Sequence, residues 1–518
     1  MRKNPDKSNT KSEKCKTENV KLENIDTEKG KMAGNKSKNS KEKDSKKKKK
    51  VRKNSSNLQI MNITYIFLLI FLGMIGYYIH FQIKESDEVI NNSYNKREEI
   101  LSQSVIRGNI LANDGTVLAE TITNDDGTET RNYPFGSLFA HSVGYSTHGQ
   151  TGVELLGNYK LLTSNAPITD IIKEDLNGEK HIGDNVVTSL DVELTKSAYN
   201  ALGDNKGAVI AIEPATGKIL AMVSKPDFDP NIIADSYIDI ISDDSNSNLL
   251  NRTTSGLYTP GSTFKLFTLY EYIKEHPDYE NYSYECSGSI SIDEYNIKCA
   301  NGRVHGEEDI YDSFAYSCNS SFVNLGLNLD KRKFKNTCEK LLFNTDLPIN
   351  YPYKASEFSL NASSSTFETM QTSIGQGKTL ITPLHLVLIA SAIANNGILY
   401  QPYVITSIEN HYETVMKTYS PEEYGTLFSQ NEVDILKKFL EGVVNYGTAQ
   451  KLQSDLYDAY GKTGTAQIED GSHTNSLFMG FAQNADKKIA VCVVMEDMPD
   501  GTIPAVPVAK AVFDTYFS

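Results

Sequence analysis

The chain has 518 residues, which is enough for two or three domains, and its formal net charge is −14. The charge is segregated: residues 1–57 carry 20 Lys and Arg against 8 Asp and Glu, so the remainder is strongly acidic. This distribution excludes a chain that is basic throughout, and it confines any attraction for polyanions to the N-terminus.

Residues 1–57 are expected to be a disordered basic tail. They contain almost no apolar clusters and include a run of five lysines, Lys46–Lys50. Such a segment cannot bury enough apolar surface to offset the entropy lost on ordering. A basic tail can bind nucleic acid, but this one lies directly before an apolar segment. Its position favours a role at the membrane, and we expect no nucleic-acid partner.

A transmembrane helix is predicted over residues 58–83. No Asp, Glu, Lys or Arg occurs between Asn54 and Ile83, and residues 63–79 read ITYIFLLIFLGMIGYYI. About 20 apolar residues suffice to cross a bilayer. The lysine-rich side is expected to remain in the cytoplasm, and no small-residue cleavage site follows. The segment therefore predicts an uncleaved, single-pass signal anchor in the cell membrane, with everything after residue 84 outside the cytoplasm.

Two domains are predicted beyond the membrane. Residues 84–178 contain short strand-like pieces broken by turns such as NDGT and DDGT, and no concentration of reactive side chains, which is typical of a spacer or pedestal domain. Residues 179–518 form the second domain. A first hairpin is predicted over 207–224, turning at Pro-Ala-Thr-Gly. A strand is predicted at 460–468, and a second hairpin over 476–497 that turns at 484–487. Its predicted helices begin near Asp191 and occupy 263–275, 310–328 and 383–396. Strands at both ends with helices between them indicate an α+β domain, an antiparallel sheet with a helical insert.

The stretch LYTPGSTFKLFT (257–268) places a Pro-Gly turn directly before Ser262 and Lys265. The apolar spacing after the turn predicts a helix. Ser262 is expected to open this helix as its N-cap, with Lys265 one turn later on the same face. Taken alone, the pair fits a capping serine and a solvent lysine better than it fits a nucleophile and its base.

Six cysteines are present. Cys286 and Cys299 frame the alternating stretch CSGSISIDEYNIKC, which predicts a hairpin that a disulfide can close in an exported protein. Cys299, His305 and Cys318 raise the question of zinc. Their spacings match no familiar zinc pattern, so neither a metal nor another cofactor is expected.

Three short motifs follow one another along the second domain. They are Ser262-x-x-Lys265, Ser317-Cys318-Asn319, and Lys462-Thr463-Gly464 followed by Thr465. Each motif is weak by itself, since serine, lysine and glycine triplets are common. Together, and in this order, they are the set found in penicillin-binding proteins and serine β-lactamases.

The chain from the apolar segment onward resembles the class B penicillin-binding proteins, the membrane-anchored D,D-transpeptidases of the bacterial cell wall. Only about 95 residues separate the membrane segment from the second domain, which leaves no room for a glycosyltransferase domain and argues against class A. His385 stands where glutamine is more usual in the family. Four segments carry the resemblance besides the three motifs: RGNILANDGTVLAE (107–120), GQTGVELLGNYKLL (149–162), NRTTSGLYTPGSTFK (251–265) and IGQGKTLITPLHL (374–386).

The resemblance implies a role for each motif residue. Ser262 is the implied nucleophile, and Lys265 the base that must lose its proton although a free lysine has a pKa near 10.4. A closed cleft and a second cation would both favour the neutral form. A backbone amide at Ser262 and that of Thr465 would hold the oxyanion. Ser317 is implied to relay a proton, and Asn319 to contact the substrate amide and Lys265. The substrate carboxylate is implied to be bound by Lys462, Thr463, Gly464 and Thr465.

The implied activity is cross-linking of peptidoglycan stem peptides through a serine acyl-enzyme that β-lactams also form. A SEDS-family glycosyltransferase is the implied membrane partner. The first alternative is a D,D-carboxypeptidase or β-lactamase-like hydrolase, which needs a group to activate water. Between Ser317 and Lys462 the only approach to an E-x-x-L-N setting is Glu339 in EKLLFN, a distant match. The second alternative is a non-catalytic β-lactam sensor or scaffold, against which the intact motif set argues.

Overall fold

The computed structural model describes residues 43–84, 97–243, 246–468, 473–499 and 501–518. The chain divides into two compact units, residues 1–84 and 85–518. The described part of the first unit is one helix, α1 (Lys43–Lys84). Within it, Leu58–Phe81 is long and apolar enough to cross a membrane, by length and composition. The helix also includes residues 43–57, which the sequence analysis assigns to the disordered tail. This stretch is rich in Lys, which is a good helix former. Residues 1–42 lie outside the described residues.

The second unit contains a six-stranded sheet in the order β15-β14-β6-β2-β3-β4. Its β6, β14 and β15 follow residue 178 and its β2, β3 and β4 precede it, so this sheet draws on both sides of the predicted boundary at residue 178. The strands are β2 (Ile110–Leu111), β3 (Val117–Thr123), β4 (Glu129–Asn132), β6 (Asn185–Thr188), β14 (Ile405–Glu409) and β15 (Val415–Thr418). Around them lie α3 (Arg97–Ser104), β1 (Val105–Ile106), η1 (Gly136–Phe139), α4 (Gly152–Leu156), α5 (Asn158–Leu161), α6 (Ile168–Asn177) and β5 (His181–Ile182).

A buried carboxylate joins the two N-terminal motifs of the sequence. Glu154 is fully buried, and its two oxygens accept from Arg107 Nε and Arg131 Nε, each at 2.7 Å. Burial alone would raise the pKa of Glu154, but the two guanidinium groups outweigh it and hold the pKa below its usual value. The segments 107–120 and 149–162, both noted in the sequence, are therefore in direct contact through Arg107 and Glu154 in the N-terminal part of the second unit.

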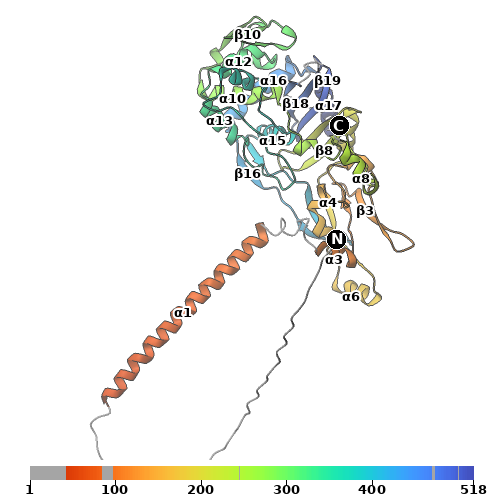
Figure 1. Ribbon diagram of the computed structural model, residues 1–518, viewed down its shortest axis with the longest axis vertical. Helices are drawn as coiled ribbons and strands as arrows, with labels where there is room; N and C mark the ends of the chain where they lie inside the picture. Colours follow the sequence, from red (N-terminus) through yellow and green to blue (C-terminus); the bar gives the residue numbers. More distant parts are fainter. Residues whose placement is uncertain (1–42, 85–96, 244–245, 469–472, 500) are drawn as a thin grey trace, which may run out of the picture. The chain divides into compact units, whose positions relative to one another are not determined.

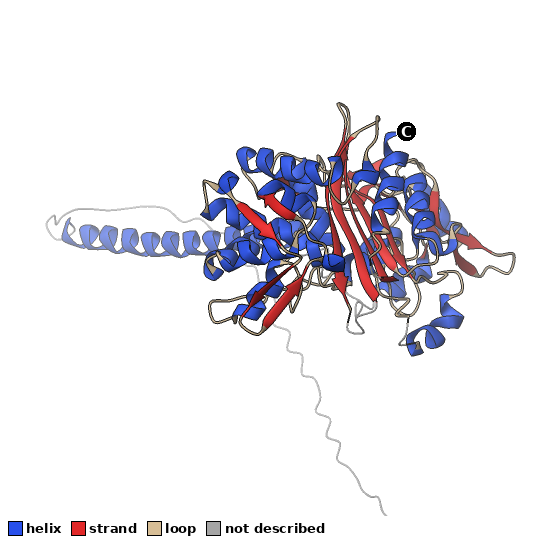
Figure 2. Cartoon of the chain, turned by 90° about the horizontal axis from the view of Figure 1, so that it is seen from above, coloured by secondary structure: helices blue, strands red, loops and turns tan. Residues whose placement is uncertain are grey.

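The larger part of the second unit is built on a five-stranded antiparallel sheet, in the order β17-β18-β19-β7-β8 (Figure 2). Both predicted hairpins are confirmed, β7 with β8 and β18 with β19. Helices lie on both sides of the sheet; α7 packs with α17, and α15, buried along its whole length, packs on β7, β18 and β19 (Figures 1 and 2). The elements are β7 (Gly207–Ile212), β8 (Ile219–Lys225), β17 (Asp458–Gln467), β18 (His473–Gln483), β19 (Lys488–Pro499), α7 (Val192–Leu202), α15 (Pro383–Ala394) and α17 (Ala505–Phe517).

The segment between β8 and β17 is the predicted helical insert. The single helix expected over 310–328 is two helices, α11 and α12, separated at Ser317 and Cys318. The alternating stretch after Cys286 forms the expected hairpin, β10 with β11. The helices are α8 (Ile233–Ser242), α9 (Arg252–Ser255), α10 (Lys265–Glu275), α11 (Ile310–Ala315), α12 (Asn319–Leu327), α13 (Lys331–Lys340), α14 (Thr366–Ser373) and α16 (Gln430–Asn445), with 3-10 turns η2 (Gly261–Phe264), η3 (Tyr279–Asn281), η4 (Ala300–Gly302) and η5 (Gln450–Leu452). The short strands are β9 (Ser283–Cys286), β10 (Ser289–Ile292), β11 (Tyr295–Lys298), β12 (Gly306–Asp309), β13 (Ile398–Tyr400) and β16 (Glu423–Thr426).

Candidate active site

Ser262 lies in the 3-10 turn η2, which runs directly into α10. The expectation that Ser262 caps this helix is wrong, because α10 begins at Lys265 and Ser262 makes no capping bond. In a 3-10 turn, residues three apart lie above one another, so the two side chains still share one face. Gly261 has φ of +54°, and a Cβ there would stand 2.4 Å from the Thr465 carbonyl oxygen. The glycine therefore lets the serine turn lie directly against strand β17.

Lys265 is fully buried and points at the second motif. Its Nζ lies 2.7 Å from the carbonyl oxygen of Ser317, 2.7 Å from Asn319 Oδ1 and 3.2 Å from Ser317 Oγ. Asn319 in turn donates from Nδ2 to the carbonyl of Lys298, at 2.9 Å. The first and second motifs are thus one hydrogen-bonded unit, which also holds the β10–β11 hairpin.

Ser317 stands between the two lysines. Its hydroxyl is 2.9 Å from Lys462 Nζ, as well as 3.2 Å from Lys265 Nζ. Its backbone has φ of +61°, in the left-handed region that favours glycine. A serine held in this conformation, where α11 ends and α12 begins, directs its hydroxyl between two amines.

Burial shapes the protonation of both lysines. It lowers the pKa of Lys265 to about 8, against the opposing influence of nearby Cys318, Cys299 and Glu308. Burial, together with the charge of Lys265, lowers the pKa of Lys462 well below its usual value. Both amines contact the same hydroxyl, and protonation of one disfavours protonation of the other. Such a pair is suited to passing a proton between its members.

The third motif lies on β17. Thr463 Oγ1 is 2.6 Å from Thr448 Oγ1, and Thr465 lines the cleft. Gly464 faces the serine turn: a Cβ there would stand 2.8 Å from the methyl group of Thr263. The structure therefore brings all the predicted site residues to one place. Thr448 was not predicted, and no short motif marks it.

The motifs surround a cleft of about 750 Å³. Among the residues that the structure describes, no Asp or Glu lines it. Glu339, the distant match to a water-activating carboxylate, lies instead on α13 and pairs with Lys335. His385 is also outside the cleft, buried with Nε2 2.6 Å from the carbonyl of Leu341. The lining includes Ser262, Lys298, Cys299, Arg303, His305, Tyr316, Ser317, Asn319, Phe367, Gln371, Gln376, Thr448, Thr463, Thr465 and Gln467.

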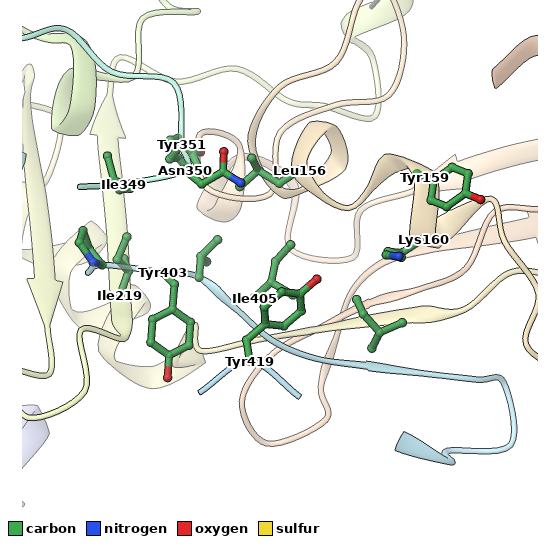
Figure 3. A pocket seen from close by; sticks show the side chains of 13 residues that line it. Leu156, Tyr159, Lys160, Ile219, Ile349, Asn350, Tyr351, Tyr403, Ile405 and Tyr419 are labelled. Carbon is green, nitrogen blue, oxygen red and sulfur yellow. The ribbon is translucent and has the colours of Figure 1, made fainter. Parts of the chain in front are cut away.

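A separate cavity of about 140 Å³ shares no lining residue with the cleft (Figure 3). It is lined by apolar and tyrosine side chains, including Leu156, Ile405 and Tyr419, and by Lys160. It holds none of the motif residues, so it does not compete with the cleft as the reactive site.

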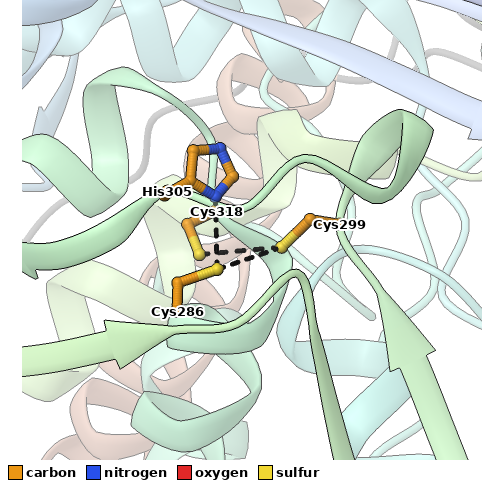
Figure 4. Close-up of side chains that lie close together, drawn as sticks. All are labelled: Cys286, Cys299, His305 and Cys318. Atoms are coloured by element: carbon orange, nitrogen blue, oxygen red, sulfur yellow. Dashed lines mark hydrogen bonds between the residues drawn. The ribbon is translucent and has the colours of Figure 1, made fainter.

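Four further side chains meet on the wall of the cleft. The potential ligand atoms of Cys286, Cys299, His305 and Cys318 all lie within 4.8 Å of one another (Figure 4). Cys286 and Cys299 are both free thiols in this structure, with their sulfur atoms 3.7 Å apart. The sequence analysis considered Cys299, His305 and Cys318 as zinc ligands but expected no metal from their spacing, and it considered a disulfide between Cys286 and Cys299.

The family model described as "Penicillin binding protein transpeptidase domain" matches residues 207–514, more than half of the chain. The chain belongs to this family. A second model, "Penicillin binding protein A dimerisation domain", matches residues 107–186 of this penicillin-binding protein. The class B resemblance read from the motifs is confirmed.

Relatives and solved structures agree with this assignment. Peptidoglycan D,D-transpeptidase PbpA of Mycolicibacterium smegmatis is 29% identical over 464 residues, 83% of this chain and 93% of that protein. The D,D-transpeptidase domain of a peptidoglycan glycosyltransferase from Eggerthella lenta superposes with a TM-score of 0.72 at 28% identity, over 80% of this chain and 98% of that one. Penicillin-binding protein A of M. tuberculosis, in an imipenem acyl-enzyme complex, superposes with a TM-score of 0.72 at 26% identity, over 80% of this chain and 99% of that one.

Proposed function

We propose that this penicillin-binding protein is a peptidoglycan D,D-transpeptidase in which Ser262 forms the acyl-enzyme and the two buried lysines move its protons. The observation that carries the assignment of roles is the position of the Ser317 hydroxyl, within hydrogen-bonding distance of both Lys265 and Lys462 at the cleft that Ser262 lines. Relatives with the same domain are named peptidoglycan D,D-transpeptidases, and one neighbour is an imipenem acyl-enzyme.

Acylation begins with removal of the Ser262 proton. Neutral Lys265 accepts it while Ser262 Oγ attacks the carbonyl carbon of the penultimate D-alanine. The backbone amides of Ser262 and Thr465 are the proposed donors to the oxyanion. When the tetrahedral intermediate collapses, the C–N bond breaks and the leaving amine takes a proton through Ser317. The terminal D-alanine departs, or, with a penicillin, the opened ring stays attached.

Deacylation uses the same groups in the opposite order. The amine of a neighbouring stem peptide attacks the ester, and its proton passes to the Lys265–Ser317 pair. The new C–N bond forms as the ester C–O bond breaks and Ser262 regains its proton. An amine brings its own nucleophilicity, so this step does not require a carboxylate to activate water, in keeping with the lining of the cleft.

The apolar segment Leu58–Phe81 and the membership in this family indicate membrane anchoring. The lysine-rich sequence before it supports a cytoplasmic N-terminus, since positive charge is retained on that side. The cleft then works outside the cell membrane, where stem peptides are. A SEDS-family glycosyltransferase, which would supply the glycan strands, is the proposed partner within the membrane. Protease added to intact protoplasts should digest the region after residue 84 and spare the N-terminal tail; the reverse pattern would invert the topology.

Fluorescent penicillin tests the nucleophile directly. The full-length chain should be labelled once per molecule, and mass spectrometry should place the adduct on Ser262. Ser262→Ala should abolish labelling while the thermal unfolding transition stays in place. Thr263→Ser is a matched control, because it keeps a hydroxyl at the neighbouring, buried position and should label normally. An adduct on any other residue would overturn the assignment.

A further inference from the structure

Helix α6 is amphipathic, but its apolar side faces away from the protein. Ile168, Ile172 and Leu176 are spaced by four residues, so they form one stripe along the helix. Their exposed fractions are 67%, 52% and 82%. A surface helix of a globular protein normally turns such a stripe toward the core. No residue of α6 is buried, and the helix projects from the N-terminal part of the second unit (Figure 1).

The acidic side chains of α6 face the protein instead. Asp170 accepts from the hydroxyl of Tyr412 at 2.8 Å. Glu174 Oε2 lies 2.7 Å from Nδ1 of His181, and Asp175 Oδ1 lies 3.3 Å from Nε2 of the same ring. All three carboxylates of the helix are thus tied to neighbouring residues, and the helix cannot turn over without breaking these contacts. The exposed stripe is therefore fixed by the fold, and an apolar partner outside the described residues would cover it.

The stripe lies close to the point where the chain enters the second unit. α3 is the first described element after α1, and the carbonyl of Ser102 on α3 accepts from Lys180 Nζ, just beyond α6, at 3.0 Å. Strand β1, which follows α3, also pairs with β5, which follows α6. Only residues 82–96 separate Phe81, the end of the apolar segment, from Arg97, the start of α3. A segment of this length spans about 50 Å at most, so the start of the second unit cannot move farther than this from the end of the apolar segment.

The size and chemistry of the stripe favour a lipid surface over a protein partner. A stable protein interface buries about 800 Å² on each partner, whereas the stripe offers three aliphatic side chains on a helix about 15 Å long. A contact that is weak by itself suffices at a membrane, because the anchor already raises the local concentration of lipid around α6. Tyr412, 54% exposed beside α6, is of a residue type enriched at membrane–water interfaces.

We propose that α6 lies on the membrane surface, with Ile168, Ile172 and Leu176 inserted at the boundary between lipid headgroups and acyl chains. An apolar helix face of this kind is buried about 5–10 Å deep. The stripe carries no charge, so its insertion depends on apolar contact and not on anionic lipid. This second contact, in addition to the anchor, would restrict how the second unit tilts over the membrane. The inference rests on membrane anchoring and is independent of the chemistry proposed for the cleft.

The test uses a single tryptophan, because the chain contains none. Leu176→Trp places it on the stripe. Ile238→Trp is the matched control, at an exposed aliphatic residue of α8, a helix of the same length as α6. The full-length proteins are reconstituted in phosphatidylcholine vesicles with and without bromine on the acyl chains, since bromine quenches tryptophan on contact. Brominated lipid should remove about half or more of the emission of Leu176→Trp and leave that of Ile238→Trp unchanged.

Two further substitutions, each combined with Leu176→Trp, test the stripe itself. Ile172→Glu puts a charge on the stripe and should abolish the quenching. Asn177→Glu adds the same charge on the polar side of the helix and should leave the quenching in place. Replacing part of the phosphatidylcholine by phosphatidylglycerol should not change it. Each variant should still be labelled by fluorescent penicillin at the wild-type rate, which shows that the fold is intact and separates failure of this inference from failure of the proposed function.

Three outcomes would overturn the proposal. The first is emission from Leu176→Trp that is typical of exposed tryptophan and insensitive to brominated lipid. The second is a blue shift that grows with the protein-to-lipid ratio without quenching by brominated lipid, which would show that a second copy of the chain covers the stripe instead. The third is quenching that appears only with anionic lipid, or equally at both tryptophans, which would show attraction of the whole protein to the surface rather than insertion of α6.

Discussion

The amine of Lys462 lies 2.9 Å from the hydroxyl of Ser317. Ser317 stands on the helical side of the site and Lys462 on the sheet, so this contact joins the two halves of the catalytic part. A hydroxyl placed between two buried amines is at once a donor and an acceptor. With the contact to Lys265, it therefore provides a path by which a proton can pass between the two lysines.

The rate of acylation should depend on pH through Lys265. Its pKa is lowered to about 8, and the base form is the reactive one. Below pH 8 the lysine is mostly protonated, and the second-order rate constant with penicillin should fall by about tenfold per pH unit; above pH 8 it should level off. Groups that face Lys265 include Lys462, Cys318, Cys299 and Glu308, so the apparent value belongs to the coupled set. A profile that is flat from pH 6 to 9 would contradict Lys265 as the base.

Ser317→Gly should be more stable than Ser317→Ala, although both lose activity. Residue 317 has φ of +61°, which costs a residue with a Cβ about 1 kcal/mol, and glycine pays no such cost. Loss of the hydroxyl should slow acylation by about 100-fold or more in both variants. Denaturant unfolding of the two proteins measures the difference.

The control for this comparison is Ser236, inside helix α8. There the order should reverse, with the glycine variant about 1 kcal/mol less stable than the alanine variant, because glycine is a poor helix former. An alanine variant at 317 that equals or exceeds the glycine variant in stability would show that the backbone conformation is not strained.

Glu154→Ala should destabilise the N-terminal module strongly. It leaves the guanidinium groups of Arg107 and Arg131 buried without their partner, which costs about 3–5 kcal/mol in free energy of unfolding. Glu193→Ala, which breaks an exposed pair with Lys196, should change it by less than about 1 kcal/mol. Because the pKa of Glu154 is lowered on folding, its contribution is present above about pH 4.5 and is lost as the pH falls through the folded value. Equal effects of the two substitutions would refute this account.

Local sequence predicted the residues of each motif because the relationships within a motif are local. The three-residue spacing of Ser262 and Lys265 fixes them on one face whether the turn is 3-10 or α-helical, so the wrong capping prediction did not displace them. The hairpins were predictable for the same reason, since alternation and a turn motif are read within about 20 residues. The order of the three motifs then led to the family resemblance, and the resemblance implied that the motifs meet.

The parts that sequence could not predict depend on contacts between distant residues. Thr448 meets Thr463 only through the packing of α16 on β17. Strand β14 joins the N-terminal sheet by pairing with β6, more than 200 residues earlier, and no local pattern selects that partner. The convergence of Cys286, Cys299, His305 and Cys318 was not predicted, although three of them were considered as zinc ligands, because they lie in or beside separate short elements and their spacing follows no compact zinc motif.

Gly261→Ala should abolish acylation without unfolding the chain. The new Cβ would stand 2.4 Å from the Thr465 carbonyl oxygen, so the serine turn must move away from β17. The backbone amides of Ser262 and Thr465 would then no longer converge on one oxyanion, a loss of about 100-fold or more in rate. Gly115→Ala is the control: its φ of +84° is strained in the same way, but its Cβ would meet nothing within 4 Å. Slow acylation in both variants would point to general destabilisation rather than to the close approach.

The penicilloyl-enzyme should persist far longer than it takes to form. Hydrolysis of the ester requires a group that activates water, and no carboxylate lines the cleft among its described residues. Lys265 and Ser317 can deprotonate an incoming amine, but an amine of a stem peptide is absent when penicillin is the substrate. The opened penicillin also stays bound and covers the approach to the ester.

The test is to acylate the full-length chain, remove free penicillin and follow the adduct by intact mass. The adduct should remain through at least several half-times of acylation. Turnover within seconds, with hydrolysed penicillin accumulating, would identify a β-lactamase-like hydrolase and contradict the transferase assignment.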